Sequence, residues 1–218
     1  LLDEIFRASG RRSHAVGNIG YPYSQAVLEG QAGDMYVCEC SSFQKETIHS
    51  FHPAAAALLN ITEDHLNRHG TMEEYTRLKM RMFENQTEED YAIFNADDPA
   101  LRDLSHQGKG HKLLFSRLKR GEEGCDCVDG QLVMHMSGKD IPIMPAREIY
   151  IPGPHNLENA LAAVCVAYVS GVRSDVIAQT LRTFRGVEHR IEWTRELDGV
   201  QYFNDSKGTN VDSTLRAV

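Results

Sequence analysis

The chain has 218 residues, of which 41% are hydrophobic and 25% charged, a composition typical of one sizeable globular domain or of one domain and part of another. Its formal net charge of −8 argues against nonspecific binding to nucleic acid or to a membrane surface, because both require a basic face. No segment has the length of a transmembrane helix or the pattern of a signal peptide, and five Cys without a secretory context favour a reducing compartment. We therefore expect no membrane insertion and a cytoplasmic location.

Strands and helices alternate along the first half of the chain. Helix 71–83 has Thr71 as its N-cap and Glu74 at the capping-box position, and Gly10 fits the C-terminal cap of an opening helix. Strands are predicted over 14–17, 35–40, 54–59, 91–95 and 112–115, with helices over 1–8, over 71–83 and from near Pro99. The helix over 1–8 lacks an N-terminal cap, so we expect a chain that begins inside a helix, as a fragment would.

The second half begins with alternating residues that predict a small antiparallel region over 121–150. Further on, helices are predicted over 155–170 and 174–184, a linker over 185–188, strands over 191–196 and 200–204 with a turn at Asp198-Gly199, and part of a helix over 210–218. The alternation predicts an α/β fold, with a mostly parallel sheet covered by helices on both faces.

Polar residues follow three of the predicted strands, at the edge where open α/β sheets bind ligands. They are Asn18, the segment Glu39 to Gln44, and the segment Asn60 to His65. The Glu39 carboxylate can hold Mg²⁺, which prefers oxygen ligands, or it can serve as a helix cap or ion-pair partner. Ser41 supplies a hydroxyl suited to phosphate. We expect the three groups to meet along one edge of the sheet.

His65 and His69 are four residues apart, the spacing of zinc hydrolases. However, no Glu follows His65, and Gly70 argues against a helix that continues through His69. We expect His69 to be a turn histidine bonded to backbone and His65 to be the functional one. Lys79 lies between apolar neighbours of helix 71–83, and its spacing alone favours a solvated helix lysine.

The cysteines form two C-x-C pairs, Cys38/Cys40 and Cys125/Cys127, which raise the question of a four-thiolate zinc site. Because Cys38 and Cys40 lie in a strand-like run, small buried thiols are the favoured interpretation.

Two later segments offer nucleotide contacts. Asn156 and Asn159 open an apolar helix, where they can cap the helix or bind the edge of a nucleobase. In the segment 204–210, Asp205 suits a ribose, and Lys207 with a nearby hydroxyl suits phosphate. The spacing G-x-x-x-x-G-K-[ST] of a phosphate loop occurs nowhere in the chain.

Six motifs, taken together and in order, resemble the Mur ligase family over essentially the whole chain. They are Gly17-Asn18-Ile19-Gly20, Glu39 with Ser41-Ser42-Phe43-Gln44, Asn60 to His65, His155-Asn156 with Asn159, His189-Arg190, and Asp205 to Asn210. The second and last are similar to those of the members that add D-glutamate. The resemblance implies ATP-dependent addition of D-glutamate to UDP-N-acetylmuramoyl-L-alanine through an acyl phosphate, in peptidoglycan precursor synthesis, by a monomer.

The resemblance also implies a role for each matching residue. Glu39 and His65 would bind Mg²⁺, and Lys79 would be carbamylated and so become a third metal ligand. Asn156, Asn159, Arg190 and Asp205 would bind ATP, Asn18, Ser41 and Thr209 would bind substrate, and Lys207 would act near the reacting carboxylate.

In extent, the resemblance implies a central ATP-binding domain over 1–186 that lacks its phosphate loop, and the start of a Rossmann-like C-terminal domain over 187–218. We therefore expect the 218 residues alone to be inactive. Cys40 replaces the apolar residue expected after the Glu. Two alternatives stay open: a metal-dependent hydrolase using Asp64, His65 and His69, and a non-catalytic nucleotide-binding module.

Overall fold

Two sheets form the body of the molecule in the computed structural model, which describes residues 1–209 and 214–215. The larger sheet has six strands in the order β3-β4-β5-β6-β7-β8, parallel from β3 to β6 and antiparallel from β6 to β8. These strands are β3 (Ala55–Leu58), β4 (Tyr91–Asn95), β5 (His111–Ser116), β6 (Gly124–Val128), β7 (Gln131–Met136) and β8 (Lys139–Pro145). A separate parallel pair consists of β1 (Ser13–Gly17) and β2 (Met35–Glu39).

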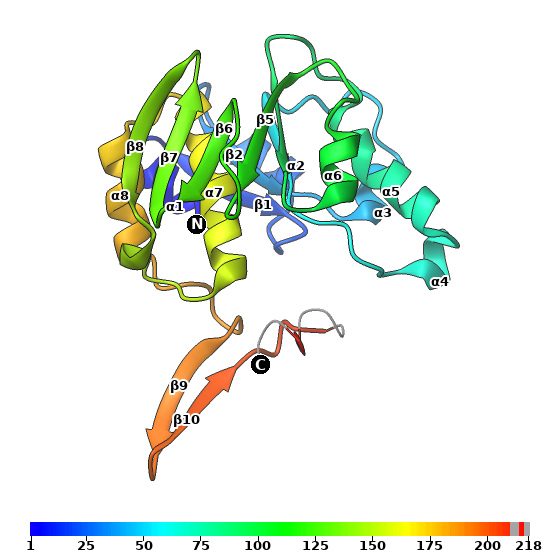
Figure 1. Cartoon of the computed structure of the whole chain (residues 1–218). Helices are drawn as coiled ribbons and strands as arrows, with labels where there is room; N and C mark the ends of the chain where they lie inside the picture. Colours follow the sequence, from blue (N-terminus) through cyan, green and yellow to red (C-terminus); the bar gives the residue numbers. More distant parts are fainter. Residues whose placement is uncertain (210–213, 216–218) are drawn as a thin grey trace.

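Helices cover both faces of the larger sheet (Figure 1). One face carries α7 (Pro154–Val169), which contacts β3 to β7, together with α1 (Leu2–Ala8) and α8 (Ser174–Thr183). The other carries α6 (Pro99–Leu104), which contacts β4. The remaining helices are α2 (Tyr23–Glu29), α3 (Ser42–Lys45), α4 (Leu66–His69), α5 (Met72–Met80), and the short 3₁₀ helices η1 (Arg81–Phe83) and η2 (Ala146–Glu148).

Strand β4 shows how the chain builds a core on each face of the sheet. Ile93 joins the cluster formed with α1, α7 and α8, whereas Ala92 and Phe94 join the cluster that contains Leu101 of α6. All of these side chains are fully buried. Because successive side chains of a strand point to opposite faces, an unbroken apolar run is what a strand covered on both sides requires.

The α/β fold with a mostly parallel sheet is confirmed, as are the predicted strands and the antiparallel region over 121–150. Three features differ from prediction. The antiparallel strands continue the main sheet through the parallel pairing of β5 with β6, and the β1–β2 pair is hydrogen-bonded separately from β3. Helix α2 was not predicted, because its N-cap is Pro22, which has no side-chain hydrogen bond.

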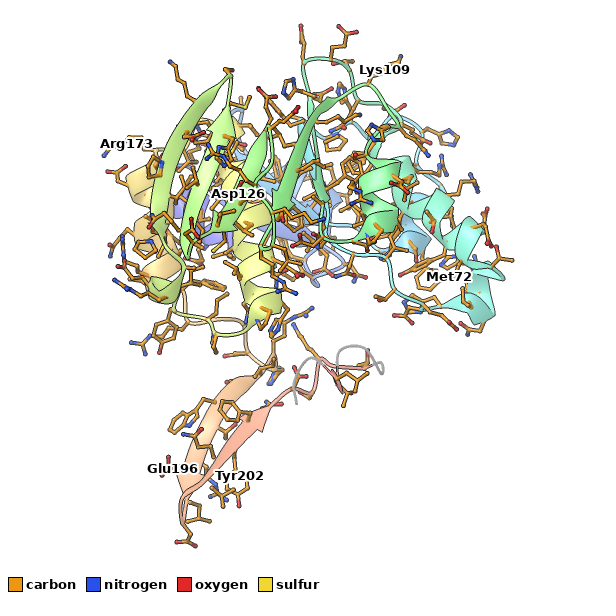
Figure 2. The ribbon with its side chains drawn as sticks, in the orientation of Figure 1. Met72, Lys109, Asp126, Arg173, Glu196 and Tyr202 are labelled. Carbon is orange, nitrogen blue, oxygen red and sulfur yellow. The ribbon has the colours of Figure 1, made fainter. Side chains whose placement is uncertain are left out.

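The last part of the described chain is the hairpin of β9 (Glu192–Leu197) and β10 (Val200–Asn204), which extends away from the body (Figure 1). Side chains such as Glu196 and Tyr202 project from it into open space (Figure 2). Residues 210–213 and 216–218, within the helix predicted at the end of the chain, lie outside the described residues. No helix in the described part is both long and apolar enough to cross a membrane.

Candidate functional site

The first part of the site forms where β1 and β2 end side by side. Gly17 pairs with Glu39 in the parallel register, and the Asn18 backbone N–H donates to the Glu39 carbonyl at 2.8 Å. The Asn18 Nδ2 donates to the Glu39 Oε1 at 2.9 Å. Gly17 has φ +92°, and a Cβ at this position would overlap the Glu39 carbonyl oxygen. A glycine is therefore required to bring the amide of Asn18 against an exposed carboxylate.

Directly after β2, Ser41 begins α3 with a complete capping box. Its Oγ accepts from the Gln44 backbone N–H at 3.3 Å, and its own N–H donates to the Gln44 Oε1 at 2.8 Å. Lys45, the last residue of α3, is buried and donates from Nζ to the Cys40 carbonyl at 2.8 Å. Burial lowers the pKa of Lys45 below its usual value. The short helix fixes the backbone that follows Glu39.

A stack of four rings, the ring column, connects α3 to α4 and α5. It runs from His65 to Phe43 (centroids 4.9 Å apart), from Phe43 to His69 (5.2 Å) and from His69 to Tyr75 (5.4 Å). Lys79 continues it, with Nζ 4.7 Å from the centre of the Tyr75 ring. These separations are those of favourable aromatic and cation–π contacts. The ring column therefore joins two of the expected metal ligands, His65 and Lys79.

His69 is at the centre of the ring column, and its interpretation as a turn histidine bonded to backbone was wrong. Its side chain is 1% exposed, and its Nε2 lies 2.9 Å from the Oγ of buried Ser42. Helix α4 does include His69 as its last residue, and Gly70 caps it with a positive φ. The bond to Ser42 fixes the start of α3 against α4.

His65 does not share a helix face with His69, because it precedes the helix as its N-cap in the left-handed region, with φ +55°. Its backbone N–H donates to the Asp64 Oδ1 at 2.8 Å, a local bond of the kind that stabilises this conformation. The imidazole is exposed and packs on Phe43. It is therefore held from one side and open to solvent on the other.

Lys79 is half-buried, unlike the solvated helix lysine that its spacing alone favours. Its Nζ donates to the Asn60 carbonyl at 3.3 Å, which ties α5 to the segment after β3. The pKa of Lys79 is lowered to about 8, first by burial and then by the charge of Lys45, while Asp64 opposes the shift. Its amine is thus more easily neutralised than that of an ordinary lysine.

The predicted convergence of the three polar groups is confirmed, although it spans two sheets. Asn18 contacts Glu39, Phe43 contacts His65, and Lys79 reaches Asn60. We call Asn18, Glu39, Ser41, His65 and Lys79 the strand-end site.

The two asparagines at the start of α7 form a small cluster of their own. Asn156 donates from Nδ2 to the Pro152 carbonyl at 2.7 Å, and Asn159 donates to the Asn156 Oδ1 at 3.5 Å. Asn159 is exposed and Asn156 is half-buried. The shorter bond matches a helix-start role for Asn156, while the exposed amide of Asn159 is accessible to a ligand.

Arg190, Asp205, Lys207 and Thr209, here called the hairpin group, lie at the base of the β9–β10 hairpin. Asp205 accepts from the Ile191 backbone N–H at 3.1 Å, and the Lys207 N–H donates to the His189 carbonyl at 3.1 Å. The side chains of Arg190, Lys207 and Thr209 are exposed. Within the described residues, no hydrogen bond or ion pair joins the hairpin group to Glu39, His65 or Lys79.

The geometry gives no support to the hydrolase built on Asp64, His65 and His69. The imidazole of His69 is buried between two rings and bonded to Ser42, so it does not face His65 as a second ligand. The two C-x-C pairs lie at the end of β2 and within β6, and these strands belong to different sheets. In residues 1–209 and 214–215, no three His, Cys, Asp or Glu side chains form a group that could hold a metal ion, so neither the hydrolase nor the four-thiolate zinc site has its ligand set.

Sequence reasoning missed the residues that hold the site together. Phe43 and Tyr75 form the middle and one end of the ring column, and Lys45 is buried at the end of α3. Tyr75 lies three positions before Leu78 on α5, a spacing that is typical of the buried face of a helix and does not point to a contact with His69. The partners of these rings are distant in sequence, so no local pattern could reveal them.

Comparison with known proteins gives three findings. A family model described as the Mur ligase middle domain matches residues 2–167. The UDP-N-acetylmuramoylalanine--D-glutamate ligase of Thermoanaerobacter pseudethanolicus is 50% identical over 218 residues, which are 100% of this chain and 48% of that protein. This chain therefore spans about half the length of the curated relatives it matches.

Solved structures agree in fold. A crystal structure of MurF from Acinetobacter baumannii has a TM-score of 0.73 at 18% identity, over 99% of this chain and 50% of that one. The MurF ligase of Thermotoga maritima, solved in complex with ADP, has a TM-score of 0.68 at 20% identity, over 99% and 52%. At these identities the likeness establishes the architecture alone.

Proposed function

Because the chain belongs to the Mur ligase family, we propose that it forms the middle part of an enzyme that adds D-glutamate to UDP-N-acetylmuramoyl-L-alanine with ATP. The observation that carries this proposal is the 50% identity, along the whole chain, to a ligase named for that reaction. The substrate carboxylate would attack the γ-phosphate of ATP, and the amine of D-glutamate would then displace phosphate from the acyl phosphate.

The strand-end site has a donor set that suits Mg²⁺. Glu39 offers an exposed carboxylate that Asn18 orients, which is the oxygen ligand that Mg²⁺ prefers. The exposed imidazole of His65 would join it as a ligand, a role that the family resemblance of the sequence supports. Bound there, Mg²⁺ would offset the negative charge that gathers on the phosphates during transfer. Asn18 would divide its amide between Glu39 and the substrate, and the Ser41 hydroxyl would contact the substrate next to them.

Lys79 would act as a carbamate. Its half-buried Nζ lies on the Tyr75 ring, a position that limits its hydration, and its lowered pKa favours the neutral amine with which CO₂ reacts. The carbamate would replace a cation with an oxygen ligand beside Glu39 and His65. The family resemblance of the sequence supports this role, which spacing alone does not.

ATP and the reacting groups would be held by the more exposed residues. Asn159 and Asn156 would face the adenine, while Arg190 and Asp205 would hold ATP from the hairpin group. Lys207 and Thr209 would contact the substrate near the reacting carboxylate. The hairpin group would belong to a second domain that begins near residue 187, after a middle domain over 1–186. The five free thiols suit the reducing cytoplasm in which we place the enzyme, as a monomer.

The test is ligation by the full-length protein, measured as D-glutamate incorporated with and without ATP. Glu39→Ala and His65→Ala should each lower the rate by about 10²-fold or more, because charge stabilisation dominates phosphoryl transfer. Glu89→Ala and His111→Ala are matched controls, since both side chains are exposed and lie outside the site. Incorporation that does not require ATP would disprove the reaction. Near-normal turnover of either site variant at saturating Mg²⁺ would disprove the assignment of that residue.

A further inference from the structure

Cys38 and Cys40 form a pair of thiols that the proposed function does not use. Cys38 lies in β2, and Cys40 directly follows Glu39, the last residue of that strand. Their Sγ atoms are 3.5 Å apart. Both residues are half-buried, whereas the other C-x-C pair, Cys125 and Cys127, is buried in β6.

A cavity of about 450 Å³ gives access to this pair of thiols. Cys38 and Cys40 both line it, and its other walls include Gly17, Pro22, Tyr23 and Phe51. The lining is mostly apolar, so the thiols face a space that suits a small organic group better than an ion with its water shell.

We propose that Cys38 and Cys40 are a covalent binding site for trivalent thiophilic metalloid compounds, such as monosubstituted arsenicals, whose organic group would occupy the cavity.

The geometry favours a bridge of one atom over a disulfide. Residues i and i+2 of an extended strand have Cα atoms about 6.6 Å apart, at the upper limit for a disulfide. A bridging atom with bonds of about 2.3 Å, as in metal thiolates, would span sulfurs 3.5 Å apart at an angle of about 100°. That angle is near tetrahedral, so the bridge would form without distortion of β2.

The surroundings favour a metalloid over a divalent metal ion. Zinc and similar ions require four ligands, and in the described part of the chain no third Cys, His, Asp or Glu completes a set with this pair. The neighbouring Lys45 donates a hydrogen bond to the Cys40 carbonyl and supplies no anionic ligand. A monosubstituted trivalent arsenical needs only two protein ligands, because its third bond is to its own organic group.

The reaction balances without an oxidant or reductant. For an arsine oxide, two As–S bonds form and the As–O bond breaks. The two thiol protons leave with the oxygen as one molecule of water, and arsenic remains trivalent.

A compound bound to Cys38 and Cys40 would affect the strand-end site through Gly17. The Cys38 Sγ lies 3.0 Å from the position that a Cβ on Gly17 would take, so the sulfur is packed directly under this residue. Gly17 begins the turn that carries Asn18 to Glu39. A bridge on the sulfurs would restrict this turn and the orientation of the Glu39 carboxylate.

The experiment uses phenylarsine oxide on the reduced 218-residue chain, with intact mass as the readout. One equivalent should add the mass of one phenylarsenic group less two hydrogens. Excess monothiol should leave the adduct in place, and a small dithiol should remove it, because only a chelating thiol pair competes with two As–S bonds. Cys38→Ser and Cys40→Ser should each lose this resistance to monothiol. The double variant Cys125→Ser, Cys127→Ser is the matched control, and its adduct should remain resistant to monothiol.

Peptide mapping of the adduct supplies a second measurement that does not depend on ligase activity. Recovery of phenylarsenic on the peptide with Cys38 and Cys40 supports the site. An adduct on Cys125 and Cys127, an adduct that survives monothiol in the Cys38→Ser variant, or no adduct at stoichiometric reagent would each overturn it. Because the readout is mass, failure of the proposed ligase activity would leave this result unchanged.

Discussion

The strand-end site and the hairpin group carry similar residue types, yet the chain holds them in different ways. In the strand-end site, side chains fix one another: Asn18 bonds Glu39, and the ring column supports His65 and Lys79. In the hairpin group, a backbone bond and the bond from the Ile191 N–H to Asp205 define the loop, while the side chains of Arg190, Lys207 and Thr209 are exposed to solvent. The first site is preorganised by packing, and the second provides side chains that a ligand must order.

This difference implies that substitutions in the two regions should affect different quantities. A change in the ring column should lower both stability and activity, because the same contacts serve the fold and the site. A change in the hairpin group should affect ligand binding and leave the fold intact. Four variants, each with a matched control, would test this difference.

The largest effect is expected for Lys79→Ala in the full-length protein. The ligation rate should fall by about 10²–10³-fold, the usual cost of removing one group that stabilises charge in the transition state. Added acetate should restore part of the rate by filling the carbamate position. Lys112→Ala is the control, because Lys112 also has a pKa lowered by burial but bonds the Gln107 carbonyl away from the site. Full activity of Lys79→Ala, or a total lack of rescue, would contradict the metal-ligand role.

His69→Ala should be the most destabilising change. It removes a buried ring from between Phe43 and Tyr75 and leaves Ser42 without its partner, at a cost of about 3 kcal/mol. Urea titration measures the loss. His111→Ala, in which an exposed imidazole loses Glu123, should change the urea midpoint little. Equal midpoints for both variants would show that the ring column contributes nothing to stability.

Gly17→Ala should cost about 1–3 kcal/mol, because it combines an unfavourable φ with overlap on the Glu39 carbonyl. Gly10→Ala isolates the first effect: Gly10 has φ +82° but open space around it. The difference between the urea midpoints of Gly17→Ala and Gly10→Ala therefore measures the destabilisation caused by the overlap with the Glu39 carbonyl. If Gly10→Ala is as destabilising as Gly17→Ala, the close approach of Asn18 to Glu39 does not depend on the absence of a side chain.

Arg190→Ala should have the smallest effect. It should raise the KM for ATP about tenfold, as expected for one charge-assisted hydrogen bond, with an unchanged thermal midpoint. Arg195→Ala, which removes an exposed guanidinium that lies over the Tyr202 ring on the same hairpin, should alter neither quantity. A lower thermal midpoint for Arg190→Ala would show that the hairpin group is as tightly packed as the strand-end site.

Local signals in the sequence were sufficient for most elements and for the convergence at the strand ends. Thr71 began its helix where predicted, because its hydroxyl accepts from the Glu74 N–H, although the Glu74 carboxylate bonds Arg77 and does not complete a capping box. Helix α2 was missed because it has no capping side chain and leaves Leu28 87% exposed, so it lacks the usual amphipathic pattern.

What the sequence did not predict within the site depends on contacts between residues that are distant along the chain. The partner of His69 is Ser42, 27 positions away, and the fold alone brings them together. The burial of Lys45 depends on the tertiary packing around α3, which contacts α5, and the spacing of charged residues contains no information about it. The separation of the β1–β2 pair from β3 likewise depends on tertiary packing: α1 contacts β1 and β2, whereas α7 contacts β3.

The position of α7 at the centre of the core affects how the chain folds during synthesis. Ile5 and Phe6 of α1 share a core with Leu161 and Val164 of α7, at the other end of the domain. At about 5–20 residues per second, the ribosome would release Leu161 roughly 8–30 s after Ile5. The apolar face of α1 must wait for its principal partner over that time. Nascent chains of this protein should therefore bind a chaperone until residue 169 has emerged, and release from it once α7 docks.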